Sequence, residues 1–110
     1  MRSFSFKYLV SVLFTLFLSI VFSQQNAVIR GFVKDSEGNP IFNATVTLEG
    51  KNYGAKTSDN GSYEIGNIPP GSYVLVCKYF GLETFNESVS LTAGQVLEKN
   101  ISLSKSKELE

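Results

Sequence analysis

Short segments of alternating apolar and polar residues fill most of the chain after residue 26, and they constrain the fold more than any other feature. In residues 44–49, Ala44, Val46 and Leu48 share one face, while two threonines and a glutamate share the other. A period of two with one polar face is typical of a half-buried strand in an antiparallel sheet. Between residues 27 and 103, no apolar stripe has the 3.6-residue period of a helix.

Turn-forming residues divide this region into seven predicted strands. They cover residues 27–34, 44–49, 55–58, 62–65, 73–79, 83–91 and 96–103. Short strands at a spacing of roughly 8–12 residues indicate an all-β fold, here a seven-stranded antiparallel Greek-key β-sandwich. The almost wholly apolar residues 73–79 predict a central strand, and residues 96–103 predict an edge strand.

Aromatic side chains are expected to supply much of the buried area that so small a sandwich needs. Phe32, Tyr63 and Tyr73 are the rings expected in the core. Residues 66–71 are expected to form a rigid connection outside the sheets, because their two prolines have no backbone N–H to donate.

Residues 1–23 have the pattern of a secretory signal peptide, which predicts a helical leader and export. An arginine and a lysine precede an uncharged stretch of 15 residues, and Val21 and Ser23 form a small-residue cleavage site before Gln24. As a helix this stretch would be about 22 Å long, less than a hydrocarbon core of about 30 Å. An uncleaved anchor is the alternative. Cleavage would leave residues 24–110 with eight basic and ten acidic side chains and no transmembrane span.

Composition excludes several classes of function. Ten basic side chains balance ten acidic ones, so the basic excess typical of nucleic-acid binding is missing. The chain has no histidine, which excludes histidine-dependent nucleophiles and histidine zinc sites. Its one cysteine, Cys77, excludes an internal disulfide and lies in the most apolar segment, where an inert buried thiol is expected. We therefore expect no catalysis, no metal site and no cofactor.

Two groups of side chains remain as candidate binding residues. Asp35, Glu37 and Asp59 could meet at one end of the sandwich and offer oxygen ligands to calcium. Alternatively, the two aspartates accept hydrogen bonds from their own turns. An exposed aromatic patch for a glycan or a protein partner is the second candidate, although core packing would explain at least two of its four members. These are Tyr53, Tyr79, Phe80 and Phe85.

Asparagines in the sequon N-x-[ST] are potential glycosylation sites only in a eukaryotic protein. They are Asn43, Asn60, Asn86 and Asn100. The predicted edge strand is a further candidate surface, because an unpaired edge can accept a strand from a partner. We expect Lys99, Lys105 and Lys107 to oppose self-association there.

Glycines, prolines and aromatic residues in a fixed order resemble the carboxypeptidase regulatory-like domain, a prealbumin-like (transthyretin-like) β-sandwich. The order runs through GFVKD, GNPI, ATV and PPGSY, and the similarity covers about residues 29–103. The residues that carry it are Gly31, Val33, Asp35, Gly38, Pro40, Ala44, Val46, Thr57, Gly61, Tyr63, Pro70, Gly71, Tyr73 and Gly81. Their residue types indicate turns, close backbone approaches and core packing rather than catalysis.

The sequence departs from the family pattern at two turns. Ser58 stands where the family usually has an aspartate, with Asp59 one place later, so a hydroxyl is expected to hold that turn. Leu82 follows Gly81 where the family usually has a tyrosine, which removes one aromatic ring and keeps the bend.

With the signal peptide ahead of it, the resemblance implies the N-terminal extension domain of a TonB-dependent outer-membrane receptor of Bacteroidetes. Such a domain, residues 24–104, would be non-catalytic, periplasmic or associated with the outer membrane, and in contact with a protein of the cell envelope. Residues 105–110 would be a charged tail, truncated from the segment that leads into the receptor plug. The alternatives are a freestanding secreted domain that binds a carbohydrate or a protein and, less favoured, an accessory domain of a metallocarboxypeptidase.

Overall fold

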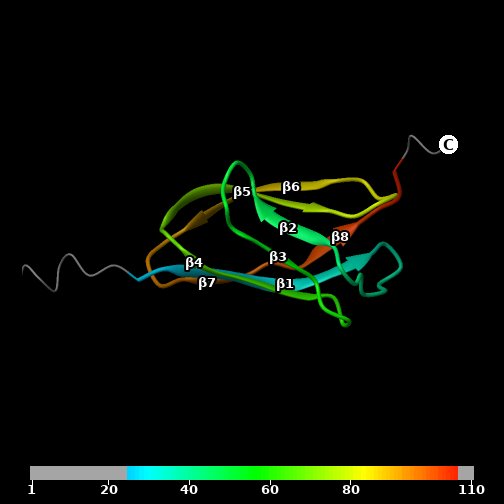
Figure 1. The fold of residues 1–110 in the computed structure, drawn as a ribbon, viewed down its shortest axis with the longest axis horizontal. Coiled ribbons are helices and arrows are strands. Elements are labelled where there is room, and N and C mark those ends of the chain that lie inside the picture. Colours follow the sequence, from blue (N-terminus) through cyan, green and yellow to red (C-terminus); the bar gives the residue numbers. More distant parts are fainter. Residues whose placement is uncertain (1–24, 107–110) are drawn as a thin grey trace, which may run out of the picture.

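The computed structural model describes residues 25–106 as an all-β fold of eight strands (Figure 1). In chain order these are β1 (Ala27–Asp35), β2 (Thr45–Leu48), β3 (Gly54–Lys56), β4 (Ser62–Ile68), β5 (Gly71–Lys78), β6 (Phe85–Leu91), β7 (Val96–Glu98) and β8 (Ile101–Leu103). The predicted signal peptide, residues 1–23, and Lys107 lie outside the described residues. No membrane-crossing helix occurs in the part of the chain that the structure describes.

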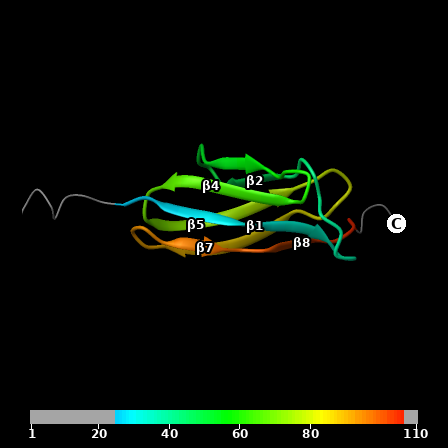
Figure 2. The same ribbon diagram turned by 90° about the horizontal axis from the view of Figure 1, so that it is seen from below.

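The strands form two packed sheets, which confirms the predicted β-sandwich (Figure 2). One sheet has the order β4-β1-β7, with β8 also paired to β1, and the other has the order β3-β2-β5-β6. Strand β5 lies between β2 and β6, so the predicted central strand is confirmed. Strands β7 and β8 pair only with β1 among the described strands, which confirms the predicted edge.

Two details of the predicted topology are wrong. The last predicted strand, residues 96–103, is two strands, and both pair with β1 in parallel rather than antiparallel. The β4–β5, β5–β6 and β6–β7 connections each reverse the chain, so β7 runs in the same direction as β1 (Figure 2). Because the turn after β6 carries the chain across to the opposite sheet, β7 lies beside β1 and does not form a hairpin with β6.

The break between β7 and β8 lies where the backbone of Lys99 passes close to Gly31. The Lys99 N–H donates to the Arg30 carbonyl at 2.8 Å, and the Lys99 carbonyl accepts from the Tyr63 hydroxyl at 2.6 Å. Asn100 Oδ1 then accepts from the Phe32 N–H at 3.0 Å, so a side chain takes the place of a backbone acceptor. Burial raises the pKa of Tyr63 above its usual range, so this hydroxyl remains a donor.

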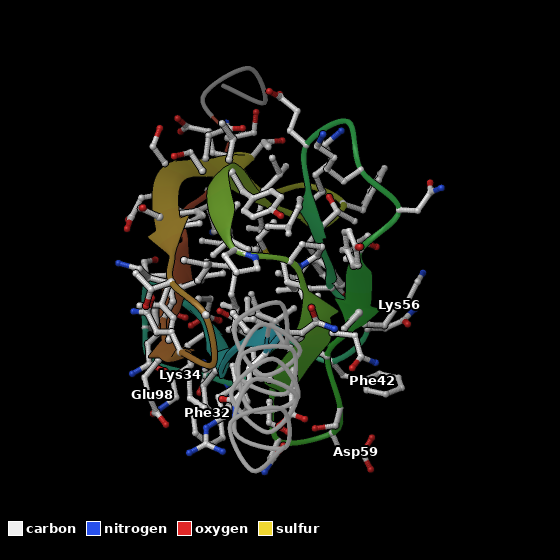
Figure 3. All side chains as sticks on the ribbon, turned by 90° about the vertical axis from the view of Figure 1, so that its left-hand side faces the viewer. Phe32, Lys34, Phe42, Lys56, Asp59 and Glu98 are labelled. Atoms are coloured by element: carbon white, nitrogen blue, oxygen red, sulfur yellow. The ribbon has the colours of Figure 1, made fainter. Side chains whose placement is uncertain are left out.

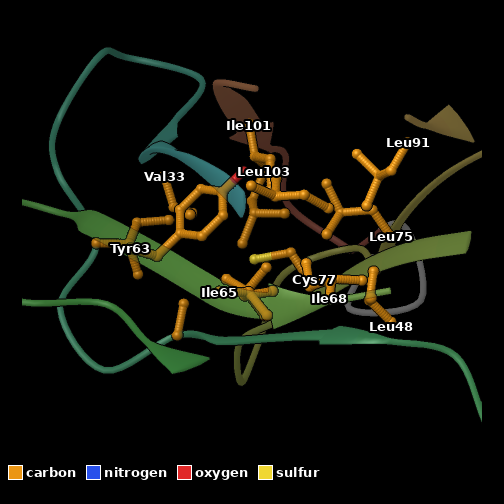
Figure 4. Close-up of a cluster of buried hydrophobic side chains, with 14 of the residues drawn as sticks. Val33, Leu48, Tyr63, Ile65, Ile68, Leu75, Cys77, Leu91, Ile101 and Leu103 are labelled. Atoms are coloured by element: carbon orange, nitrogen blue, oxygen red, sulfur yellow. The ribbon is translucent and has the colours of Figure 1, made fainter. Parts of the chain in front are cut away.

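Side chains from both sheets form one hydrophobic core (Figure 4). The larger members that are almost fully buried are Ile29, Leu48, Ile68, Leu75, Leu103, Val33, Val46 and Cys77. Tyr63 is buried as predicted and Tyr73 packs partly against the core. The prediction for Phe32 is wrong: it lies on the outer face of β1, 42% exposed, with Lys34 Nζ 6.0 Å from the ring centroid (Figure 3).

The connection between β4 and β5 is shorter than predicted. Gly66, Asn67 and Ile68 belong to β4, and only the two prolines separate the strands. The register with β1 shifts by one residue here, and Asn67 has a φ of 57°. This β-bulge lets the strand keep pairing up to Ile68 before the prolines end it. The Tyr73 hydroxyl donates to the Pro69 carbonyl at 2.6 Å and closes the corner.

Replacing Gly31 with alanine should destabilise the fold, because a Cβ there would lie 2.0 Å from the Lys99 carbonyl oxygen. We expect Gly31→Ala to lower the free energy of unfolding by about 2–4 kcal/mol, from overpacking and the weakened Tyr63 hydrogen bond. Urea denaturation measures this. The matched control is Gly66→Ala in β4, where a Cβ would meet nothing within 4 Å. Equal stability of the two variants would contradict the prediction.

Candidate functional site

A groove of about 560 Å³ lies at the end of the sandwich where the β1–β2 and β5–β6 loops meet the chain after β8. These connections lie together at the right of Figure 1, opposite the end at which β1 begins. Aromatic rings, carboxylates and one ammonium group line the groove. They belong to Phe42, Tyr79 and Phe80, to Asp35 and Glu37, and to Lys105. Ile41, Leu82 and Leu103 supply aliphatic surface.

Three aromatic rings at this groove are exposed to solvent. Phe80 is 96% exposed, Phe42 58% and Tyr79 42%. Of the four aromatic residues predicted as a patch, Tyr53 and Phe85 instead pack against the core. Phe85 begins β6 opposite the buried Cys77, and Tyr53, just before β3, accepts a backbone hydrogen bond from the buried Leu48.

The predicted aromatic patch did not include Phe42, which the backbone turns outward. Ile41 and Ala44 on either side are buried, while Asn43 adopts a φ of 68° in the left-handed region. Figure 3 shows Phe42 pointing away from the sandwich. The position of Phe42 directly before an asparagine, in a loop that follows Pro40, was the available signal, since asparagine tolerates positive φ.

The loop that carries Tyr79 and Phe80 is held by a tight turn. The Leu82 N–H donates to the Tyr79 carbonyl at 3.1 Å, and Gly81 has a φ of 82°. The chain after β8 pairs with the far side of this turn, where the Glu83 N–H donates to the Ser104 carbonyl at 2.8 Å. An isolated antiparallel bridge joins Leu82 to Lys105. Residues 104–106 therefore fix the loop from outside.

Asp35 organises the opposite side of the groove. Its Oδ1 accepts from the N–H groups of Glu37 and Asn39, each at 2.9 Å. These backbone hydrogen bonds, that of Asn39 above all, lower the pKa of Asp35. The three side chains considered as calcium ligands do not meet, because no three acidic, cysteine or histidine side chains gather at one point in residues 25–106. Asp59 lies in the separate turn between β3 and β4 (Figure 3).

The Thr57 hydroxyl joins two loops inside the fold. It accepts from the Ala44 N–H at 2.8 Å and donates to the Ile41 carbonyl at 2.6 Å, and its side chain is buried. The Ser58 hydroxyl contacts Asn60 Oδ1 and the Ser62 hydroxyl, both at 2.6 Å, so hydroxyl contacts do hold this turn.

The other family-pattern residues lie in strands and turns. Gly31, Val33, Val46, Tyr63, Gly71 and Tyr73 are in strands, and Ala44 is buried just before β2. Gly38, Gly61 and Gly81 have positive φ in turns, while Pro40 pairs with Lys34 and Pro70 precedes β5. The four sequon asparagines, Asn43, Asn60, Asn86 and Asn100, are all exposed.

The lysines near the predicted edge strand were expected to oppose self-association, and Lys99 does not lie free to do so. Lys99 Nζ forms an ion pair with Glu87 of β6, which ties the two sheets together along one side. Lys99 is therefore not a free charge that opposes self-association. Lys105 lies at the groove.

The sequence profile of the carboxypeptidase regulatory-like domain matches residues 28–104. The chain belongs to this family. The carboxypeptidase regulatory-like domain is a non-catalytic β-sandwich, in agreement with the structural positions of the residues that carry the family pattern. The fold and the family therefore agree on a β-sandwich module.

Two curated relatives share this domain. The TonB-dependent receptor SusC of Bacteroides thetaiotaomicron is 33% identical over 63 residues, which are 57% of this chain and 6% of that protein. Carboxypeptidase Z of Gallus gallus is 33% identical over 63 residues, which are 57% of this chain and 10% of that enzyme. The chain thus spans a tenth or less of the length of these relatives.

Similarity to solved structures supports the fold. A type II cohesin–X-dockerin complex from Acetivibrio cellulolyticus superposes with a TM-score of 0.61 at 24% identity, over 72% of this chain and 58% of that one. The major pilin subunit BcpA of Bacillus cereus gives a TM-score of 0.58 at 20% identity, over 74% and 31%. At these identities the similarity shows a shared β-sandwich architecture.

The turn held by Asp35 should make stability depend on pH. Because the folded-state pKa of Asp35 is lowered, its contribution is complete above the unfolded-state pKa of about 3.9 and is lost as the pH falls through the folded-state value. The urea midpoint of the wild type should exceed that of Asp35→Asn at pH 7, and the difference should shrink as the pH falls below about 3.9. The control Ser36→Ala should follow wild type. A constant difference from pH 7 to pH 2 would contradict this assignment.

Cys77 should react only when the protein unfolds. Its side chain is fully buried, and burial raises the pKa of the thiol to about 11. At pH 8 we expect modification by a thiol reagent to be at least about a hundredfold slower in the native protein than in urea. The exposed control Ser36→Cys, in a Cys77→Ser background, should react rapidly in both. Fast native labelling of Cys77 would show that the core opens readily.

Proposed function

We propose that this chain is the N-terminal extension domain of a TonB-dependent outer-membrane receptor. The observation that carries the proposal is the 63-residue match to SusC, a TonB-dependent receptor. The predicted signal peptide of residues 1–23 lies directly ahead of the matched domain, as export to the envelope requires.

In this proposal the domain is a non-catalytic protein-contact module in the periplasm. Two buried side chains that carry a hydroxyl or thiol nucleophile serve the fold. The Thr57 hydroxyl forms hydrogen bonds with two backbone groups, and the Cys77 thiol is enclosed in the core. The exposed aromatic groove is the surface best suited to contact, since such rings are rarely left exposed without a partner.

A freestanding secreted binding domain is the second candidate, and the same exposed rings favour it. The two candidates differ in the protein sequence beyond residue 110 and in where the protein is found. The charged residues 105–110 lead into a plug segment in the receptor proposal and end the protein in the other.

Fractionation of cells that express the natural gene distinguishes the two candidates. With an antibody against residues 25–106, we expect one large species in the outer-membrane fraction, whose N-terminal sequence begins at Gln24. A Ser23→Phe change should slow this processing, whereas Ser5→Ala should not. A small species released into the medium would contradict the receptor proposal and support the freestanding domain. An N-terminus at Met1 would contradict the predicted cleavage.

A further inference from the structure

We propose that the groove between the β1–β2 and β5–β6 loops binds an extended, proline-rich peptide segment that carries lysine or arginine. The proposal deepens the protein-contact role above and rests on it. The ligand is identified by the chemistry of the groove, which combines exposed aromatic rings with two carboxylates and one ammonium group.

The rings suit a polyproline II segment. Phe42 from one loop and Tyr79 and Phe80 from the other line the groove together with Pro40. A polyproline II helix presents rigid apolar rings with three residues per turn, and aromatic-lined grooves are its usual receptors. Leu82, which is half-buried, adds apolar surface to the same groove.

The groove is pre-organised for binding. The Tyr79–Leu82 turn is closed by its own hydrogen bond and fixed from outside by residues 104–106. Asp35 fixes the opposite loop through two backbone amides. Because both sides are held before the ligand arrives, little conformational entropy is lost in ordering them.

Charges at the groove define the peptide further. Asp35 and Glu37 come from the end of β1 and the β1–β2 loop, and Lys105 comes from the chain after β8. A lysine or arginine in the peptide would pair with the carboxylates, and Lys105 would repel a basic residue placed beside it. The depressed pKa of Asp35 keeps its carboxylate charged well below neutral pH.

The same features make a sugar a poorer fit. Binding a sugar through its hydroxyls requires acceptors with free lone pairs in fixed positions. Asp35 Oδ1 already accepts two backbone N–H groups, so a ligand finds fewer free acceptor positions on this carboxylate and must use Oδ2. A lysine ammonium is a point charge and can approach that oxygen from more than one direction.

Fluorescence anisotropy of the exported, purified chain with a labelled peptide of repeated Pro-Pro-Lys units tests the proposal. We expect saturable binding at micromolar to submillimolar concentration, and at least about tenfold weaker binding of Gly-Gly-Lys and Pro-Pro-Glu repeats. Phe80→Ala should weaken binding at least about tenfold without changing stability, because the side chain is 96% exposed. The matched control Phe32→Ala, on the outer face of β1, should bind as wild type.

A charge exchange separates specific recognition from loss of fold. Glu37→Lys should weaken binding of the Pro-Pro-Lys peptide and strengthen that of the Pro-Pro-Glu peptide. Equal binding of the Gly-Gly-Lys peptide, or unchanged binding by Phe80→Ala, would overturn the proposal. Binding of the Pro-Pro-Lys peptide that does not saturate at millimolar concentration would also overturn it. So would a result in which the peptides do not bind, but maltohexaose or xylohexaose binds and Phe80→Ala abolishes that binding. These results leave the receptor assignment to be decided by the fractionation experiment.

Discussion

The close approach of the Lys99 carbonyl to Gly31 is the contact on which the rest of the structure depends. It lets β7 and β8 both pair with β1, on either side of a break at residues 99 and 100. The Tyr63 hydroxyl donates to the same carbonyl from β4, on the other side of β1. Strands β1 and β4 therefore both meet the Lys99 carbonyl between β7 and β8, and a side chain at residue 31 would displace it.

This contact also sets the position of the groove. With β8 held in parallel register to Asp35, the chain leaves the sheet at the end where the β1–β2 loop begins. It then pairs with the β5–β6 loop from the opposite sheet. One end of the sandwich thus gathers the two loops and the outgoing chain, while the Lys99–Glu87 ion pair joins the sheets along their side.

Local patterns predicted much of the fold and less of the groove. Alternation in residues 44–49 and the apolar residues 73–79 identified strands correctly, because burial on one face imposes a period of two. Parallel pairing of β7 could not be predicted, since it depends on which sheet the chain enters after β6. Phe32 points outward because of the register of β1, and Phe42 points outward because the next residue, Asn43, adopts a left-handed conformation. Tyr79 and Phe80 line one groove with Phe42 only through tertiary packing.

A nuclear Overhauser spectrum of the folded chain tests most directly that this contact organises the sandwich. The structure predicts cross-peaks of a parallel pair between residues 28–30 and 96–98, and between 33–35 and 101–103, with Gly31 close to Lys99. Cross-peaks of an antiparallel hairpin between β6 and β7, with none from Gly31 to Lys99, would contradict the account.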